Sequence, residues 1–439
     1  MSYDIFIRQV IEVDRFFIKT LGCKVNQCDS EALREKLLAL GMREAFEKEN
    51  ADLSIVNTCC VTATADRKSR YAVRVAAKRK GRGLLVVIGC YPGYDRLAIE
   101  RIKGVDGVFS NAQRKELLDW IKQRQADSRK RESLFLIDAN AQKKHIFGHK
   151  RAFLKVQDGC DNRCSYCIIP TVRGGSKSRC VEDVIEEANR KSGEGFKEIV
   201  LTGVCLGAYG RDFSKKVDLI DLIGLIEQVP DVQRIRLSSI EASDVTDRLI
   251  EKMASSSKLC PHLHIPFQSG DDQVLTAMKK RLKVSSYKKI VEKAKKKINN
   301  LAITCDFIVG FPVEEETNFM NTLDFIKFVK PARVHVFPYS KRNGAVEFSK
   351  FVEDKVMQKR LVLLRDLSRR MSDNYCRSFI GKELGVLFEV KRGGYWQGYS
   401  ENYIKFIVAS NRSLANSLKS VKMNSLAKDQ EHCVFGVLV

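Results

Sequence analysis

Short apolar runs alternate with amphipathic stretches along the first 120 residues. Apolar runs at 16–23, 51–59 and 84–90 predict buried strands, and the stretches at 30–40 and 67–80 repeat apolar residues at helical spacing. Strand–helix alternation at this spacing predicts βαβ units and a parallel sheet. We therefore expect a first α/β domain at 15–125, followed by a polar, charge-rich linker at 126–147.

A second and longer alternation fills 148–375. Its apolar runs predict six strands at 152–158, 198–204, 234–239, 262–267, 303–311 and 333–340, with helical stretches between them. Six such units favour an open or partial (β/α) barrel over a doubly wound sheet.

The pattern changes again at 376–439. Apolar and polar residues alternate around the turn at Gly393 and Gly394, as in small antiparallel barrels. The predicted fold class is thus α/β, with a parallel α/β domain, a partial (β/α) barrel and a small C-terminal β-barrel.

The charge of the chain narrows the choice of partners. Lys and Arg number 77 against 54 Asp and Glu, a formal net charge of +23. The electric field of this positive charge favours a polyanionic partner. A basic protein whose lysines are only solvated would, however, have the same composition. No apolar run is long enough for a membrane span, and the charged leader is unlike a signal peptide. We expect a cytoplasmic protein without a membrane partner, whose 14 cysteines are metal ligands or core thiols.

The strongest chemical signal is the loop "GCDNRCSYC", which places Cys160, Cys164 and Cys167 in a C-x3-C-x2-C arrangement. Three thiolates on short tethers suit an iron–sulfur cube with one iron left open. A structural zinc site would close its tetrahedron with a fourth ligand, for which His149 is the nearby candidate.

Three further cysteines, Cys23, Cys59 and Cys90, each end one apolar run of the first domain. Parallel strands end at one edge of a sheet, so the topology would bring all three to one rim. Cys60 follows Cys59 directly, and neighbouring residues at a strand end point opposite ways. Buried cysteines after strands are also common as small apolar residues, so the spacing alone leaves a second cluster and plain packing both open.

The C-x3-C-x2-C loop, with Tyr166 before its last cysteine, resembles the radical S-adenosylmethionine enzymes. The segments "TLGCKVNQ", "NTCCVTATADRKSR", "VIGCYP", "LTGVCLGAYG", "HLHIPFQSGDDQ" and "HVFPYSKRNG" are similar to those of the methylthiotransferases within that superfamily. "TLGCKVNQ" with "HVFPYSKR" is most like the branch that acts on N6-threonylcarbamoyladenosine in tRNA, and the C-terminal part resembles the RNA-binding TRAM domain.

This resemblance implies two [4Fe–4S] clusters, one held by Cys160, Cys164 and Cys167 and an auxiliary one held by Cys23, Cys59 and Cys90. It implies that S-adenosyl-L-methionine supplies both a methyl group and a 5′-deoxyadenosyl radical, and that C2 of the adenosine at position 37 receives a methylthio group. The implied partners are the tRNA anticodon stem-loop and a reductase as electron donor. A cysteine, Cys205, stands where the family commonly has a polar residue.

The sequence also predicts roles for residues outside the cysteine motifs. Candidates for cofactor contact are Tyr166, Arg179, Gly203, Ser239, Glu241 and Gln268. Arg173 and Arg179 would meet a carboxylate, a phosphate or a surface acid. His262 and His264 are expected to pack or hydrogen-bond rather than bind metal. Basic and aromatic residues suited to RNA are Arg67, Lys68, Arg70, Lys391, Arg392, Tyr395 and Trp396.

Three functions remain open on the sequence. The first is the tRNA methylthiotransferase, with isopentenyladenosine or a ribosomal protein as alternative substrate. The second is a radical enzyme whose N-terminal cysteines hold no cluster. The third is a zinc-stabilised RNA-binding protein without catalysis.

Overall fold

The computed structural model describes residues 13–45, 51–126, 150–342, 346, 348–427 and 432–439. The predicted linker at 126–147, the first 12 residues and His149 therefore lie almost wholly outside the described residues. The chain divides into two compact units. The first takes in the described residues up to Ala126 with Cys167–Gly174 and Arg342, and the second takes in the remainder.

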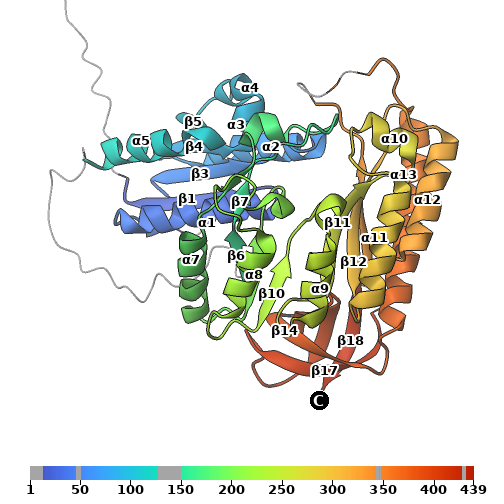
Figure 1. The fold of residues 1–439 in the computed structure, drawn as a ribbon. Coiled ribbons are helices and arrows are strands. Elements are labelled where there is room, and N and C mark those ends of the chain that lie inside the picture. The colour runs from blue at the N-terminus through green and yellow to red at the C-terminus, as the bar shows by residue number, and fades with distance from the viewer. Residues whose placement is uncertain (1–12, 46–50, 127–149, 343–345, 347, 428–431) are drawn as a thin grey trace, which may run out of the picture. The chain divides into compact units, whose positions relative to one another are not determined.

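The first unit is a parallel five-stranded sheet in the order β2-β1-β3-β4-β5 (Figure 1). Its strands are β1 (Arg15–Thr20), β2 (Arg43–Glu44), β3 (Leu53–Thr58), β4 (Leu84–Gly89) and β5 (Gly107–Ser110). Its helices are α1 (Lys24–Ala39), α2 (Ala63–Arg79), α3 (Cys90–Tyr94), α4 (Arg96–Glu100), the 3-10 turn η1 (Asn111–Gln113) and α5 (Arg114–Ala126), with α6 (Ile169–Arg173) from the returning segment.

Apolar side chains on both faces of this sheet build two cores. One core joins α1 and α5 to the sheet through residues such as Leu33, Leu37 and Ile121. The other joins α2, α3 and α4 to the opposite face. Because both faces are covered, the strands are continuously apolar, which is why the sequence reveals them so clearly.

The second unit contains six parallel strands in two sheets, β10-β9-β6 and β11-β12-β13. Isolated bridges between Ile235 and Leu259 and between Ser239 and His264 join the two sheets into an open arc. The strands are β6 (Arg151–Lys155), β9 (Glu198–Thr202), β10 (Arg234–Leu237), β11 (His262–Gln268), β12 (Ala302–Val309) and β13 (Arg333–Pro338). A small antiparallel pair, β7 (Gln157–Asp158) and β8 (Lys177–Ser178), lies beside them.

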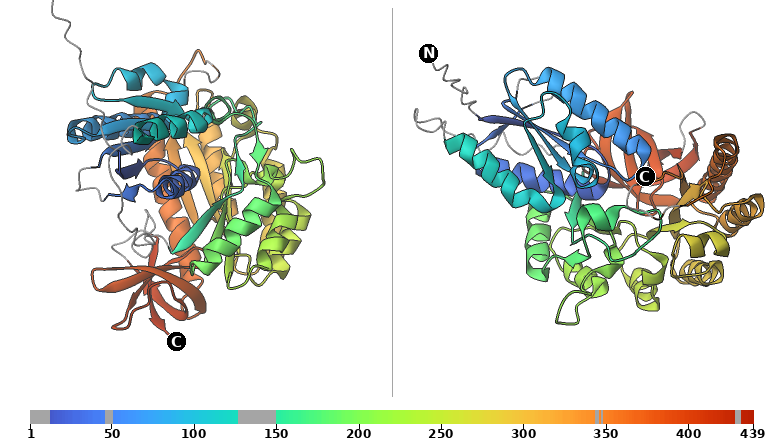
Figure 2. Two further views of the ribbon diagram at one scale, coloured as in Figure 1. Left: turned by 90° about the vertical axis from the view of Figure 1, so that its left-hand side faces the viewer. Right: turned by 90° about the horizontal axis from the view of Figure 1, so that it is seen from above.

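Helices of the second unit cover the outside of the arc (Figure 2). They are α7 (Val181–Gly193), α8 (Leu219–Glu227), α9 (Asp247–Ser255), α10 (Asp272–Ala277), α11 (Val284–Lys297), α12 (Glu316–Val329) and α13 (Asp354–Arg377), with 3-10 turns η2 (Leu206–Ala208) and η3 (Ala242–Asp244). The predicted partial (β/α) barrel is confirmed.

The chain ends in a closed five-stranded barrel, as the alternation predicted. Its strands are β14 (Glu383–Arg392), β15 (Tyr395–Ser400), β16 (Lys405–Ala409), β17 (Leu418–Leu426) and β18 (Cys433–Leu438). The boundary expected at residue 376 falls inside the continuous helix α13, and the barrel belongs to the same compact unit as the arc. Among the described residues, no helix is both long and apolar enough to cross a membrane.

Candidate metal centres

Three cysteines meet at the carboxyl edge of the sheet in the first unit. Cys23 immediately precedes α1, Cys59 follows β3, and Cys90 opens α3 directly after β4. The parallel pairing of Thr20 with Asn57 and of Thr58 with Gly89 brings the ends of the three strands to one level. The three sulfurs are close enough for the charges of Cys90 and Cys23 to raise the pKa of Cys59, in addition to the larger effect of burial.

A glycine allows the loop of Cys23 to approach Cys59 closely. Gly22 has φ +103°, and a Cβ at that position would lie 2.7 Å from Cβ and 3.1 Å from Sγ of Cys59. Any side chain would therefore meet both a strained backbone and the thiol it must clear.

The adjacent cysteines Cys59 and Cys60 have different surroundings. Ser69 fixes the backbone of Cys59, because its hydroxyl accepts from the Cys59 N–H over 3.1 Å and donates to the carbonyl oxygen over 2.8 Å. Burial raises the pKa of the Cys59 thiol to about 12. Cys60 is completely buried in the apolar cluster with Val73 and Tyr91. The two residues point apart as expected, and Cys60 acts as a core residue.

Sequence reasoning missed Asn26 beside Cys90, whereas Arg173, predicted to meet a carboxylate, a phosphate or a surface acid, meets the carboxylate of Asp29. The amide of Asn26 donates to the carbonyl oxygens of Leu21 over 2.7 Å and Thr58 over 3.0 Å, while its Oδ1 lies 3.8 Å from Sγ of Cys90. The same oxygen accepts from the guanidinium of Arg173, which also pairs with Asp29. Asn26 is fully buried on the polar side of α1, and a buried Asn three residues after a candidate ligand was the available signal.

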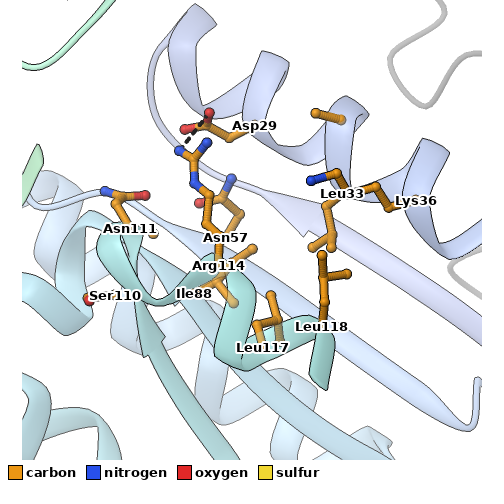
Figure 3. A pocket seen from close by; sticks show the side chains of 12 residues that line it. Asp29, Leu33, Lys36, Asn57, Ile88, Ser110, Asn111, Arg114, Leu117 and Leu118 are labelled. Carbon is orange, nitrogen blue, oxygen red and sulfur yellow. Dashed lines mark ion pairs between the residues drawn. The ribbon is translucent and has the colours of Figure 1, made fainter. Parts of the chain in front are cut away.

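A small cavity of about 70 Å³ lies between α1 and α5, next to this cysteine edge (Figure 3). Asp29 and Arg114 form an ion pair of 2.8 Å across it, and Leu33, Leu117 and Leu118 line its apolar side. Asn111, another lining residue, donates to Sγ of Cys90 over 3.5 Å. The polar wall of the cavity therefore also supports the edge that carries the cysteines.

The C-x3-C-x2-C loop follows β7. Cys160 and Cys164 belong to the second unit, and Cys167 begins the segment that belongs to the first. The backbone N–H of Asn162 donates to Sγ of Cys160 over 3.4 Å. Cys164 lines a cavity of about 20 Å³ together with Glu241. Burial raises the pKa of Cys164, whereas the nearby ammonium of Lys280 lowers it.

Cys205 lies directly beside Cys160. The two thiols share a hydrogen bond, which lowers the pKa of Cys160 and raises that of Cys205. The side-chain amide of Asn162 also points at Cys205, with 3.8 Å between Nδ2 and Sγ, and the backbone N–H of Cys205 donates to Gln157 over 2.8 Å. The sequence marked Cys205 as unusual, and the fold places its thiol against a predicted cluster ligand.

Two predicted cofactor residues lie near these cysteines. The hydroxyl of Tyr166 hydrogen-bonds to Cys164, and its ring packs beside the cluster of Val274, Met278 and Phe311. Gly203 follows β9, where an added Cβ would lie 3.0 Å from Oε1 of Gln157. The space that a side chain at position 203 would need is thus occupied by Gln157.

The remaining predicted cofactor residues are more scattered. Glu241 accepts from the buried ammonium of Lys280 over 2.5 Å. Ser239 bridges β10 to His264, and Gln268 ends β11 with a φ of +71°, a left-handed value that is rare for a non-glycine residue. Arg179 pairs with Glu187 over 2.6 Å and donates to the carbonyl oxygen of Lys155. Of the partners considered for Arg179, the surface acid is the one its geometry favours.

Some of the predicted RNA-contact residues are exposed, and others are held by the protein itself. Arg67 and Lys68 are exposed on α2, and Tyr395 is 44% exposed on β15. Arg70 is held by the hydroxyl of Tyr91 over 2.6 Å. Trp396 is buried in the core of the closed barrel, so the expectation that it stacks on RNA is not supported.

The donor sets suit thiolate-bound metal. The 14 cysteines are thiols and not disulfides. Burial keeps the pKa values of Cys59, Cys90 and Cys164 above the ordinary thiol value, and a bound metal would release those protons because it takes the thiolate form. The three converging sulfurs of Cys23, Cys59 and Cys90, with polar side chains beside them, fit an iron–sulfur cluster at the carboxyl edge of the first unit's sheet.

Two family models match this chain, one over each of the regions that carry the cysteines. Residues 15–110 match the model described as "Uncharacterized protein family UPF0004", and residues 154–326 match the "Radical SAM superfamily". The chain is 36% identical to the threonylcarbamoyladenosine tRNA methylthiotransferase of Bacillus subtilis, over 92% of each chain.

Two further proteins are similar to this chain, one in sequence and one in fold. The chain is 32% identical to the tRNA-2-methylthio-N6-dimethylallyladenosine synthase of Alkaliphilus oremlandii, covering 85% of this chain and 82% of that one. In fold it is similar to the radical S-adenosylmethionine methyltransferase TsrM from Kitasatospora setae, solved with cobalamin and a [4Fe–4S] cluster bound. That match has a TM-score of 0.55 at 12% identity and covers 88% of this chain and 77% of that one.

Proposed function

Because the chain belongs to the tRNA methylthiotransferases of the radical S-adenosylmethionine superfamily, we propose that it converts N6-threonylcarbamoyladenosine at position 37 of tRNA into its 2-methylthio derivative. The observation that carries the proposal is the meeting of Cys23, Cys59 and Cys90 at one sheet edge, in a chain that also holds the C-x3-C-x2-C loop. A chain with one cluster site would suit a simpler radical reaction.

Six cysteines would hold the two [4Fe–4S] clusters. Cys160, Cys164 and Cys167 would bind the one that takes S-adenosyl-L-methionine, and Cys23, Cys59 and Cys90 the auxiliary one. Three thiolate ligands leave one iron of each cube open to another ligand. When bound, the clusters and S-adenosyl-L-methionine supply the radical and methyl-transfer chemistry that adenine C2 requires, since side chains alone cannot break that C–H bond.

The residues of the chain position and shield these groups. The ammonium of Lys280 beside Cys164 and Glu241 offsets negative charge at the loop, and Tyr166 holds Cys164 through its hydroxyl. At the auxiliary edge, Asn111 and Arg173 donate hydrogen bonds to Cys90, which stabilise thiolate sulfur. Ser239, Gly203 and Gln268 remain proposed contacts of the cofactor.

Binding of tRNA rests on charge and on the C-terminal barrel. The formal net charge of +23 suits a polyanion. Arg67 and Lys68 are exposed on α2, and an unpaired anticodon-loop base can be splayed out for chemistry. We propose that the protein acts in the cytoplasm on the anticodon stem-loop and receives electrons from a separate reductase.

One alternative substrate is supported by a specific observation. The relative that is 32% identical is named for dimethylallyladenosine, so methylthiolation of that base is the second candidate. The higher identity, 36%, to a threonylcarbamoyladenosine enzyme favours the first. The zinc-stabilised RNA-binding protein without catalysis is set aside, because the chain belongs to a family of enzymes.

Nucleoside mass spectrometry of tRNA tests the proposal. A strain that lacks the gene should keep threonylcarbamoyladenosine and lose its 2-methylthio form, and the gene on a plasmid should restore it. Loss of the 2-methylthio mark from isopentenyladenosine instead would assign the second substrate. If both marks persisted in the deletion strain, the proposed activity would be rejected.

A further inference from the structure

Strands β11, β12 and β13 lie side by side in the arc (Figure 1), and their inner face carries a row of polar side chains. Alternate residues of these strands, such as Ile265, Cys305 and Val334, pack outward into the core beneath the helices. Residues between them point the opposite way because side chains alternate along a strand. The inward row consists of His262, His264, Thr304, Asp306, Arg333 and His335.

Strand register gathers three of these side chains. Thr304 is level with His264 on one side, and Asp306 is level with His335 on the other. Asp306 therefore lies between two imidazoles. Its Oδ2 is 3.1 Å from Nε2 of His264, and its Oδ1 is 3.0 Å from Nδ1 of His335. One donor atom from each of the three residues lies within 4.8 Å of the others.

Contacts with the hydroxyl of Thr304 orient the ring of His264. Nδ1 of His264, the ring nitrogen that faces away from Asp306, lies 2.9 Å from Oγ1 of Thr304. The same hydroxyl is 3.0 Å from Nε2 of His262. In proteins, the far nitrogen of a metal-binding histidine is commonly fixed by such a hydrogen bond, which sets the ring's tautomer and orientation.

The charge and exposure of the three side chains also suit a cation. Asp306 offers carboxylate oxygen and the two histidines offer imidazole nitrogen, and both donor types bind divalent transition metals. The side chains of His264, Asp306 and His335 are 14%, 20% and 38% exposed, so an ion can reach them from the inner face.

We propose that His264, Asp306 and His335 bind one divalent transition-metal ion, with Zn²⁺ or Fe²⁺ as the favoured class. Two imidazoles and one carboxylate on one side of an ion leave the opposite coordination positions open. Metal–nitrogen and metal–oxygen distances of about 2.0–2.2 Å correspond to donor separations slightly above 3 Å, close to those present. The open positions face the interior of the arc and would take water or an oxygen ligand.

This site is independent of the cysteine centres and of the proposed function. None of its donors is a thiol, and none belongs to the cluster motifs. Sequence reasoning treated His262 and His264 as packing or hydrogen-bonding residues. That description holds for His262, whereas His264 acquires a second role once Asp306 and His335 are placed beside it.

Titration of Mn²⁺ into the cluster-loaded protein, followed by EPR, tests the site. Mn²⁺ binds imidazole and carboxylate but has little affinity for thiolate, so the cysteines do not interfere. We expect one saturable Mn²⁺ per chain, with nuclear modulation from imidazole nitrogen, and displacement by Zn²⁺. The substitution Asp306→Asn should weaken binding by more than about tenfold, and Thr304→Val by about tenfold.

His432→Ala is the matched control, since this histidine bonds to Ser372 and takes no part in the triad. It should leave Mn²⁺ affinity unchanged. Iron content and the unfolding temperature verify that each variant is folded, and His335→Gln replaces Asp306→Asn if the latter is not. Absence of saturable Mn²⁺ binding, or equal binding by wild type and the folded triad variants, would mean that the three residues form a hydrogen-bonded triad only and would overturn the proposal.

Discussion

The side-chain amide of Asn26 donates to the carbonyl oxygen of Thr58 over 3.0 Å, and so ties the first turn of α1 to the end of β3. These are the elements that carry Cys23 and Cys59. The same amide holds Leu21, and its oxygen faces Cys90. One buried side chain thus contacts all three cysteine-bearing segments, which makes Asn26 a positioning residue for the auxiliary centre.

Replacing Asn26 by Leu should damage this centre selectively. Leu has a similar volume but leaves two buried carbonyl oxygens unpaired, each costing about 1–3 kcal/mol. We expect the free energy of unfolding to fall by a few kcal/mol and iron content to drop by one cluster. Asn189→Leu, at an exposed position on α7, is the control. Full iron content in the Asn26 variant would show that the amide has no role in positioning.

The two adjacent cysteines should respond differently to serine. Cys59→Ser removes a proposed ligand, so iron should fall by one cluster and 2-methylthio product to the level of a control without enzyme. Cys60→Ser places a hydroxyl in an apolar cluster and should lower stability by about 1–3 kcal/mol while iron and product remain. Iron analysis and nucleoside mass spectrometry of the two variants check this. The reverse pattern would assign the ligand to Cys60.

Cys205 should set the reduction potential of the neighbouring cluster. Its thiol hydrogen-bonds to Cys160, and hydrogen bonds to cluster sulfur raise the potential because they stabilise the more negative reduced state. The valine of Cys205→Val has a similar volume and no hydrogen-bond donor, so the midpoint potential of the cluster should fall. The hydroxyl of Cys205→Ser can still donate, so the midpoint potential should stay close to that of wild type. An EPR-monitored redox titration in a Cys59→Ser background isolates this cluster. Equal potentials in the Val and wild-type proteins would contradict the prediction.

A buried ion pair joins the arc to the closed barrel. Arg236 contacts Glu198 at 2.7 and 3.3 Å with both side chains fully buried, and it also donates to the carbonyl oxygens of Ser400 and Glu401. Arg236→Met leaves a buried carboxylate without its main partner and should cost about 3–5 kcal/mol in urea unfolding. Arg248→Met, which breaks an exposed pair, should cost at most about 1 kcal/mol. Similar losses in both variants would show that burial is unimportant here.

The same pair predicts a dependence on pH. Burial raises the pKa of Glu198, but Arg236, together with Arg151 and Arg234, outweighs it and holds the pKa below the ordinary value. A carboxyl whose pKa is lower in the folded protein stabilises the fold above its unfolded pKa and loses that contribution as the pH falls through the folded pKa. Urea midpoints should therefore drop below about pH 4.5 more steeply in wild type than in Glu198→Gln. Parallel curves would rule out this linkage.

Much of the fold and of the cysteine sites was predictable. Strands β3 and β4 are buried on both faces, so their apolar runs are visible without any partner, and a cysteine directly follows each of them. The C-x3-C-x2-C loop is equally local, since short tethers alone restrict its three thiols. The prediction that Trp396 stacks on RNA was wrong, because the local sequence around an aromatic strand residue does not show whether it faces solvent or a barrel core.

The sequence by itself determined the order of elements, the fold class and the cysteines at strand ends, because periodicity and short spacing are properties of neighbouring residues. Only the tertiary structure decided that Asn26 reaches Cys90, that Cys205 meets Cys160, and that Asp306 lies between His264 and His335. Those contacts join residues tens of positions apart. They depend on the register between parallel strands, which is fixed when whole faces pack together and is encoded by no single segment.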